Sequence, residues 1–154
     1  MPEGVRRVGL ISDTHGLVRP QALAAQRGSD RIVHAGDIVE PTILATLAQI
    51  APVTAVRGNN DRGAWADALP ETAVLEIGGI RLFVIHDLKQ AGSAAAGCEV
   101  VVAGHSHKPT VERRDGMLVV NPGSAGPRRF TLPVTVGRLE IEEGHVHAEI
   151  VQLL

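Results

Sequence analysis

The sequence predicts an α/β fold in which two mixed β-sheets pack as a sandwich and helices flank them. Two observations lead to this prediction. The first half of the 154-residue chain alternates short apolar runs with runs of helical spacing, an order typical of parallel strands joined by crossover helices. The second half contains three segments with the pattern of β-hairpins, each turning at a pair that includes glycine. The length suits a single domain over residues 1–154.

The first half supplies three strands and two helices. Apolar runs of strand length cover residues 8–12, 32–35 and 53–56. Helices are expected over residues 20–27 and 40–51, because each segment has a proline at or next to its first residue and apolar positions at helical spacing. This order predicts a βαβαβ arrangement with parallel strands.

The second half changes from helices to hairpins. The expected turns are Gly78-Gly79 within residues 74–85, Asp115-Gly116 within 111–121 and Glu143-Gly144 within 138–151. Residues 100–103 form another buried strand. Residues 90–96 carry only a weak helical pattern, because glycines flank an alanine-rich stretch. The order in which the strands pair is left open.

Composition limits the classes of function. Hydrophobic residues make up 44% of the chain but aromatic residues only 2%, so the core is built from aliphatic side chains. A net charge of −2 gives no electrostatic case for bulk nucleic-acid binding or for an anionic membrane surface. One cysteine excludes an internal disulfide, and the apolar run near the N-terminus is too short for a signal peptide or a membrane span. We therefore expect a soluble cytoplasmic protein.

One pattern recurs five times along the chain: a strand-like run ends and a polar residue able to bind a metal follows at once. If these strands share a sheet edge, the polar residues converge, because the carboxyl ends of strands are where α/β proteins form sites. Carboxylate, imidazole and amide ligands without thiolate favour Mn²⁺, Fe, Zn²⁺, Co²⁺ or Ni²⁺ over Mg²⁺ or Ca²⁺. The residues are Asp13 and His15, Asp37, Asn59, His86, and His105 and His107.

The five motifs together resemble those of the calcineurin-like metallophosphoesterases. They are Asp13-x-His15, Gly36-Asp37, Gly58-Asn59-x-Asp61, His86 and Gly104-His105-x-His107. The likeness is greatest to the small YfcE-type phosphodiesterases of bacteria and archaea, and a retromer subunit with the same fold is a more distant relative. The resemblance implies a four-layer αββα architecture. It also implies that Asp13, His15 and His107 hold one divalent metal ion, that Asn59, His86 and His105 hold a second, and that Asp37 bridges them.

The resemblance further implies hydrolysis of a small phosphodiester by a hydroxide that two metal ions activate, with Mn²⁺ as the first choice of ion. Asp37, Asn59 and His86 are then the expected catalytic residues. Asn60 stands where larger relatives carry a histidine that acts as general acid, which argues against phosphomonoesters. Asp87 stands where glycine is expected, as a partner of His86 or as a solvated residue. The alternatives are a phosphomonoesterase and a protein-binding scaffold with little activity.

Several residues have a plain structural interpretation beside the functional one. Asp13 and Asp37 also suit helix caps, and Asn59-Asn60 suits a turn. His34 is expected to be packed rather than a ligand, and Asp61 to hold its loop by hydrogen bonds.

Four arginines are candidate phosphate contacts, namely Arg57, Arg62, Arg128 and Arg129. Arg62 and Arg128 are preferred because both follow motif loops, although surface arginines are common. A homo-oligomer stays open, since the terminal strands are rich in valine and leucine.

Overall fold

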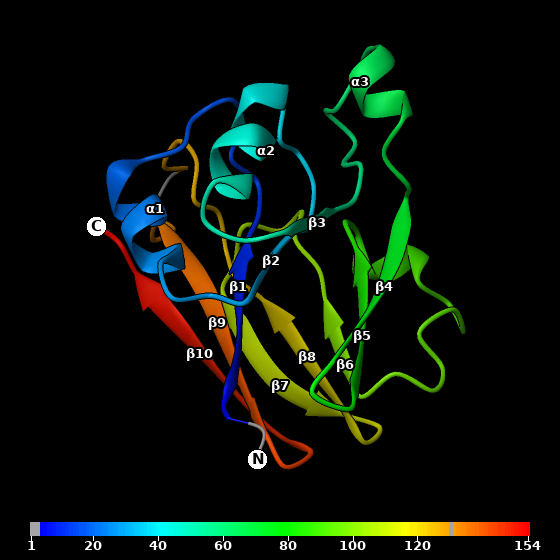
Figure 1. Ribbon diagram of the computed structural model, residues 1–154. Helices are drawn as coiled ribbons and strands as arrows, with labels where there is room; N and C mark the ends of the chain where they lie inside the picture. The colour runs from blue at the N-terminus through cyan, green and yellow to red at the C-terminus, as the bar shows by residue number, and fades with distance from the viewer. Residues whose placement is uncertain (1–3, 130) are drawn as a thin grey trace.

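The computed structural model describes residues 4–129 and 131–154 and contains two five-stranded sheets packed face to face (Figure 1). The strand order is β10-β9-β1-β2-β3 in the first sheet and β4-β5-β6-β8-β7 in the second. The predicted two-sheet α/β sandwich is therefore confirmed. The strands are β1 (Arg6–Ile11), β2 (Arg31–His34), β3 (Val53–Ala55), β4 (Thr72–Ile77), β5 (Ile80–Ile85), β6 (Val100–Val102), β7 (Thr110–Arg114), β8 (Met117–Asn121), β9 (Thr135–Glu142) and β10 (His145–Gln152).

The first sheet takes its form from the βαβαβ segment. Strands β1, β2 and β3 pair in parallel, and the helices α1 (Pro20–Gln26) and α2 (Pro41–Ala48) connect them. Both helices begin at a proline, whose fixed φ suits the first turn and whose missing N–H costs nothing there. In Figure 1 both helices lie on the outer face of this sheet. Apolar side chains from the helices pack there against Ile11, Ile32 and Val136.

The second sheet takes its form from hairpins. Strands β4 and β5 pair antiparallel through the Gly78-Gly79 turn, and β7 and β8 through the Asp115-Gly116 turn. The third hairpin, β9 and β10, joins the first sheet instead, where β9 pairs antiparallel with β1. All three predicted hairpins are present, but nothing in the local pattern indicated that the last one crosses to the other sheet.

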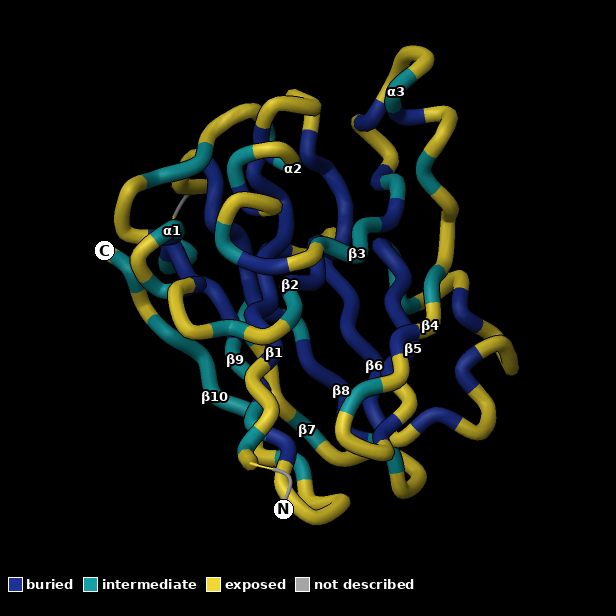
Figure 2. Tube along the Cα trace, viewed as in Figure 1, coloured by how far each residue is buried: buried dark blue, intermediate teal, exposed yellow. Residues whose placement is uncertain are grey.

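The main core lies between the two sheets and is aliphatic, as the composition predicts. It joins buried residues of the first sheet, such as Leu10 and Val33, to residues of the second, such as Leu82, Val102 and Val120. Figure 2 shows β1, β2, β5, β6 and β8 buried along most of their length, whereas the edge strand β10 is mostly intermediate and the hairpin tips are exposed. Helix α3 (Ala64–Asp67) buries only Ala66. Each fully buried leucine or valine of this kind contributes about 2 kcal/mol relative to an exposed one.

The layer that covers the outer face of the second sheet, the last of the four layers, contains little helix. The outer face of the second sheet packs against a 3₁₀ turn, η1 (Leu88–Gln90), and against the turns that follow it up to Cys98. The weak helical pattern of residues 90–96 does not become an α-helix, because Gly92 and Gly97 both take positive φ values, 53° and 85°. Among the described residues, no helix is long and apolar enough to cross a membrane.

The carboxyl ends of five strands meet at one end of the sandwich. Three of these strands, β1, β2 and β3, belong to the first sheet, and β5 and β6 belong to the second. Hydrogen bonds tie the loops together across the sheets, for example from the His105 amide to Asp13 Oδ2 at 3.1 Å. The expectation of one shared sheet edge is therefore replaced by two edges that face each other, because each sheet contributes its own parallel strands.

Candidate metal centre

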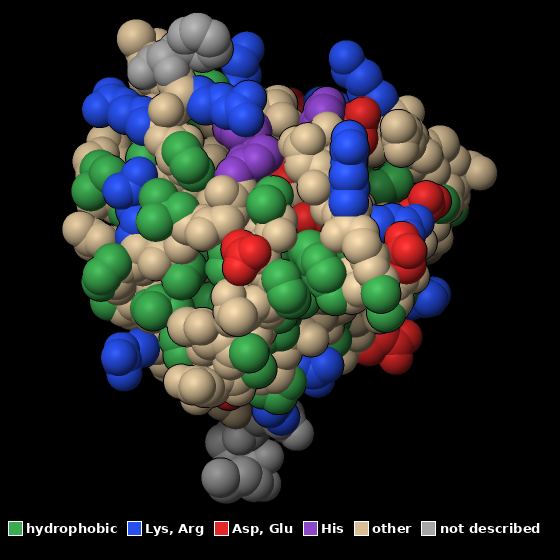
Figure 3. Space-filling model, turned by 90° about the horizontal axis from the view of Figure 1, so that it is seen from above, with side chains coloured by type: hydrophobic (Ala, Val, Ile, Leu, Met, Phe, Trp, Pro, Cys, Tyr) green, Lys and Arg blue, Asp and Glu red, His purple; other side chains and the backbone are tan. Residues whose placement is uncertain are grey.

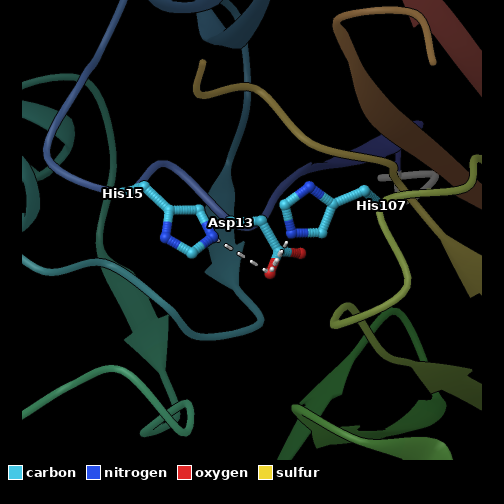
Figure 4. Close-up of side chains that lie close together, drawn as sticks. All are labelled: Asp13, His15 and His107. Carbon is cyan, nitrogen blue, oxygen red and sulfur yellow. Dashed lines mark ion pairs between the residues drawn. The ribbon is translucent and has the colours of Figure 1, made fainter. Parts of the chain in front are cut away.

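Three residues from two distant segments form the first group of candidate ligands. His15 Nε2 lies 3.9 Å from Asp13 Oδ1, and His107 Nε2 lies 3.4 Å from the same oxygen. Figure 4 shows both imidazole rings directed at this carboxylate from opposite sides. One ligand atom from each residue falls within 4.8 Å of the others. The structure thus brings together the three residues expected to hold the first ion.

The second group surrounds Asn59. Its Oδ1 lies 3.0 Å from His86 Nε2 and 3.2 Å from His105 Nδ1. Asp37 Oδ2 lies 3.4 Å from His86 Nε2 and 3.6 Å from His15 Nε2. Asp37 therefore lies between the two groups, at the position a bridging ligand would take.

The oxygen and nitrogen atoms of these side chains are better suited to binding cations than to hydrogen bonding with one another. Asp13 Oδ1 and His15 Nε2 are buried without a hydrogen-bond partner. His86 Nδ1 donates to the Ala35 carbonyl at 2.7 Å, so the neutral ring turns the lone pair of Nε2 toward the Asn59 and Asp37 oxygens. Several acceptors aimed at one another need a proton or a metal ion between them.

The electrostatics of the metal-free protein reflect this crowding. Burial works to lower the pKa of His86, but a hydrogen bond to Asp37 and the charges of Asp13 and Asp37 raise it above its ordinary value. Burial works to raise the pKa of Asp37, but hydrogen bonds from His86 and Asn60 hold it well below its usual range. Burial lowers the pKa of His15, against the pull of both carboxylates. Asp37 thus stays charged, and its negative charge lies beside the Nε2 atoms of His86 and His15, where it favours a cation.

The backbone turns sharply at most of the predicted ligands. Five of the seven have positive φ values: Asp13 (54°), His15 (47°), Asp37 (59°), His105 (73°) and His107 (64°). Such values are uncommon outside glycine and concentrate at functional sites. They redirect each side chain at the point where its strand ends, so that residues from separate strands face one space.

Two glycines before ligands are needed for space rather than for conformation. A Cβ on Gly58 would lie 2.2 Å from the Asp37 amide nitrogen, and one on Gly104 would lie 2.1 Å from Ser12 Oγ. Gly36 combines both needs, with a φ of 103° and an added Cβ 2.7 Å from His86 Nδ1. A side chain at any of these three positions would therefore collide with the loops that meet at the centre.

A layer of polar residues fixes the ligands. Asp61 is buried and accepts hydrogen bonds from the backbone amides of Asp37, Val39 and Gly58 at 2.9, 2.7 and 2.8 Å, which confirms its expected role in holding the loops. Asn60 donates its backbone and side-chain amides to the Asp37 carboxylate at 2.8 and 2.9 Å. Asp37 is therefore held at its backbone and at both oxygens.

His34 is packed below the centre, as expected. The Gly36 amide donates to Nδ1 at 3.1 Å, so Nε2 carries the proton and donates to Thr14 Oγ1, also at 3.1 Å. Thr14 in turn donates to the Ile38 carbonyl. Burial lowers the pKa of His34 to about 4, so this ring stays neutral.

Three more polar side chains, those of Ser12, Asn121 and Ser124, also brace this centre. Ser124 Oγ donates to the Asp13 carbonyl at 3.0 Å, and Asn121 Nδ2 donates to the Gly104 carbonyl at 3.0 Å. Ser12 also donates to Asp13 Oδ2, at 2.7 Å. These residues support metal-ligand loops from behind. No local pattern marks such a role, because it depends on which loops meet in space.

A cavity of about 500 Å³ opens beside the second group. Arg57 is the arginine that lines it, and its guanidinium pairs with Glu71 at 3.0 Å. Arg62 and Arg128, preferred in the sequence, are exposed and do not line this cavity. Arg129 lies close enough to His15 for its charge to lower the pKa of that ring. Figure 3 shows histidine side chains at the surface on this end of the molecule, with Lys and Arg side chains near them. The cavity is lined by Arg57, Gly58, Asn59, Asp61, Glu71, Thr72, Ile85, His86, Asp87, Gln90 and His105.

The sequence pattern of the calcineurin-like phosphoesterase superfamily domain matches residues 7–144. The chain belongs to this superfamily. A probable metallophosphoesterase of Methanothermobacter thermautotrophicus is 35% identical to this chain, over 94% of this chain and 91% of the relative. A phosphodiesterase of Methanocaldococcus jannaschii is 26% identical over 89% of this chain and 94% of the relative.

Solved structures share the fold of this chain. The Yfce phosphoesterase of E. coli superposes with a TM-score of 0.69 at 23% identity, covering 96% of this chain and 100% of that one. Vacuolar Protein Sorting 29 of Cryptosporidium parvum superposes with a TM-score of 0.78 at 17% identity, covering 97% and 98%. The fold therefore occurs in an enzyme and in a protein-sorting component, and the two must be separated by the site itself.

Proposed function

We propose that this chain is a metal-dependent phosphodiesterase. One observation carries the proposal: seven residues from five strand ends form two adjoining ligand groups with Asp37 between them. Two ions bound there, with Mn²⁺ as the first choice, would neutralise phosphate charge and lower the pKa of a water molecule to produce the nucleophile. Asp13, His15 and His107 would hold one ion, Asn59, His86 and His105 the other, and Asp37 both.

The protein's own residues then have distinct tasks. Asp37, Asn59 and His86 lie at the junction of the two groups, where the reacting phosphate would sit, and are the proposed catalytic residues. The Asn60 amides hold the Asp37 carboxylate in one orientation, which keeps both of its oxygens aimed at the centre.

The substrate preference follows from Asn60. Its side-chain amide is committed to Asp37 and carries no proton that it can readily transfer. A substrate whose leaving group departs without a general acid is then favoured, which supports diesters with good leaving groups over monoesters.

The cavity beside His86 and His105 would take one substituent of the diester, with Arg57 as its cationic wall. Arg62 and Arg128 remain predicted substrate contacts, and they would bind a larger substituent that extends beyond the cavity. The named phosphodiesterase among the relatives supports the same class of substrate.

The test compares bis(p-nitrophenyl) phosphate with p-nitrophenyl phosphate after chelator treatment and addition of Mn²⁺. We expect the diester to be hydrolysed faster, and activity to be lost in Asp37→Ala. Activity that ignores the chelator, or that survives Asp37→Ala, would refute the mechanism. No hydrolysis under any of these conditions would favour the scaffold alternative, which the likeness to Vacuolar Protein Sorting 29 keeps in view.

A further inference from the structure

Asp87 uses its two carboxylate oxygens on two different neighbours. It follows His86 directly at the end of β5, where the family resemblance leads us to expect glycine. Its Oδ1 accepts a hydrogen bond from the Lys89 amide at 3.1 Å and so caps the turn η1. Its Oδ2 lies 4.0 Å from His105 Nε2. The capping role therefore leaves one oxygen directed at the histidine.

Asp87 is not a partner of the His86 ring. The Nδ1 of that ring already donates to the Ala35 carbonyl at 2.7 Å, and its Nε2 faces Asn59 Oδ1 at 3.0 Å. Both ring nitrogens are thus engaged away from Asp87. The sequence suggested that Asp87 tunes His86, but the geometry transfers that role to His105.

The two nitrogens of His105 face opposite neighbours. Nδ1 lies 3.2 Å from Asn59 Oδ1, within the second ligand group, and Nε2 faces Asp87. The backbone of His105 is held independently, because its amide donates to Asp13 Oδ2. The ring therefore presents Nδ1 to the centre, and Asp87 is the carboxylate beside its outer nitrogen.

We propose that Asp87 is a positioning residue that keeps the proton of His105 on Nε2, so that Nδ1 offers its lone pair to an ion in the second group. This rests on the proposed metal centre. A carboxylate that accepts from the outer nitrogen fixes the tautomer and raises the basicity of the ligating nitrogen. The two atoms lie 4.0 Å apart, so a small rotation of either side chain would bring them within hydrogen-bond distance.

The test measures binding of Zn²⁺ to the full chain after chelator treatment, by competition with a chromogenic chelator. Asp87→Asn keeps an oxygen for the Lys89 amide but places an NH₂ group opposite the His105 Nε2–H. We expect one of two sites to weaken about tenfold, at the low end for this class of partner, with the other unchanged. Asp87→Ser, which also caps turns, should give a similar loss.

A second readout and a control separate positioning from general effects. In ¹⁵N-histidine spectra of the Zn²⁺-loaded wild type, His105 should show a bound Nδ1 and a protonated Nε2, and the Nε2 proton should exchange faster with water in Asp87→Asn. Glu76→Gln removes a carboxylate that pairs with Arg81 at 3.3 Å on the β4–β5 hairpin, and should bind Zn²⁺ like wild type.

Each result is decisive. Unchanged Zn²⁺ affinity in Asp87→Asn, an equal loss in Glu76→Gln, or a bound Nε2 on His105 would overturn the role of Asp87 alone. A wild-type chain that binds no Zn²⁺ would overturn the metal centre and the inference together.

Discussion

Replacement of Asp61 by asparagine removes one acceptor from a buried carboxylate that ties three loop amides together. In the native chain Oδ2 accepts from the Asp37 and Gly58 amides, and Oδ1 accepts from the Val39 amide. Asparagine has one acceptor oxygen. If that oxygen keeps its two bonds, the NH₂ group faces the Val39 N–H, and two donors meet in a site with only 5% of the residue exposed.

The cost follows from the bonds that are lost. One hydrogen bond to a charged acceptor contributes roughly 1.5–3 kcal/mol, and a buried donor left unpaired costs a similar amount. We therefore expect Asp61→Asn to lower the free energy of unfolding by about 3 kcal/mol. For a chain of this size that corresponds to a decrease in Tm of roughly 6–12 °C. The rate of diester hydrolysis should also fall, by about 10²-fold, because the loop that carries Asp37 loses its hydrogen bond at the Val39 amide.

Urea unfolding of the chelator-treated protein, followed by circular dichroism, measures the change without any contribution from metal binding. Asp67→Asn is the matched control. Its carboxylate is 77% exposed and lies 3.8 Å from Arg57, so the same chemical change should alter stability by no more than about 0.5 kcal/mol. A loss below about 1 kcal/mol in Asp61→Asn would refute the reasoning, because the three short bonds would then carry little weight.

Three further perturbations have defined outcomes. Because the pKa of His34 falls to about 4 on folding, the unfolded chain takes up this proton first, so stability should decline between pH 6.5 and 4 by roughly 3 kcal/mol; in His34→Asn, urea titrations at several pH values should show a shallower decline. Gly104→Ala places a Cβ 2.7 Å from Asp13 Oδ2 and should lower the free energy of unfolding by about 1–3 kcal/mol, with weaker Mn²⁺ binding in calorimetry. Mn²⁺ at about 100 times its Kd should stabilise the native state by about 2.7 kcal/mol for each site, and Asp13→Asn should remove the share of the ion that Asp13, His15 and His107 hold, as measured in thermal melts.

Local patterns were sufficient to predict most of the elements. Strand β6 is a run of three valines with no competing signal, and the hairpin turns carry glycines that take positive φ values. The pairing of the strands was out of reach. Strand β9 lies between β10 and β1, so it joins the first sheet rather than following the hairpins before it. That choice depends on which faces bury each other at long range, and periodicity does not report it.

The residues that meet at the candidate centre were easier to predict than their surroundings. A strand that ends in Asp-x-His or Gly-Asp marks its own position in the sequence, so Asp13, His15 and Asp37 needed no knowledge of the fold. Arg57 was ranked below Arg62, yet it is Arg57 that lines the cavity. Its place is set by the Glu71 pair and by the end of β3, which sequence spacing does not reveal.

The positive φ values at the candidate centre restrict which residue types can act as ligands there, whatever ion is bound. Apart from glycine, aspartate, asparagine and histidine are the residues that tolerate this conformation best. Five of the proposed ligands sit in it, and all five are aspartate or histidine. Exchange of one of them for cysteine or glutamate would therefore alter the fold of the loop as well as the ion it prefers. Evolutionary substitution by cysteine is therefore disfavoured at these five positions by the backbone conformation. Descendants of this chain should accordingly keep a centre of carboxylate and imidazole ligands, and the metal ions that prefer thiolate ligands should remain excluded.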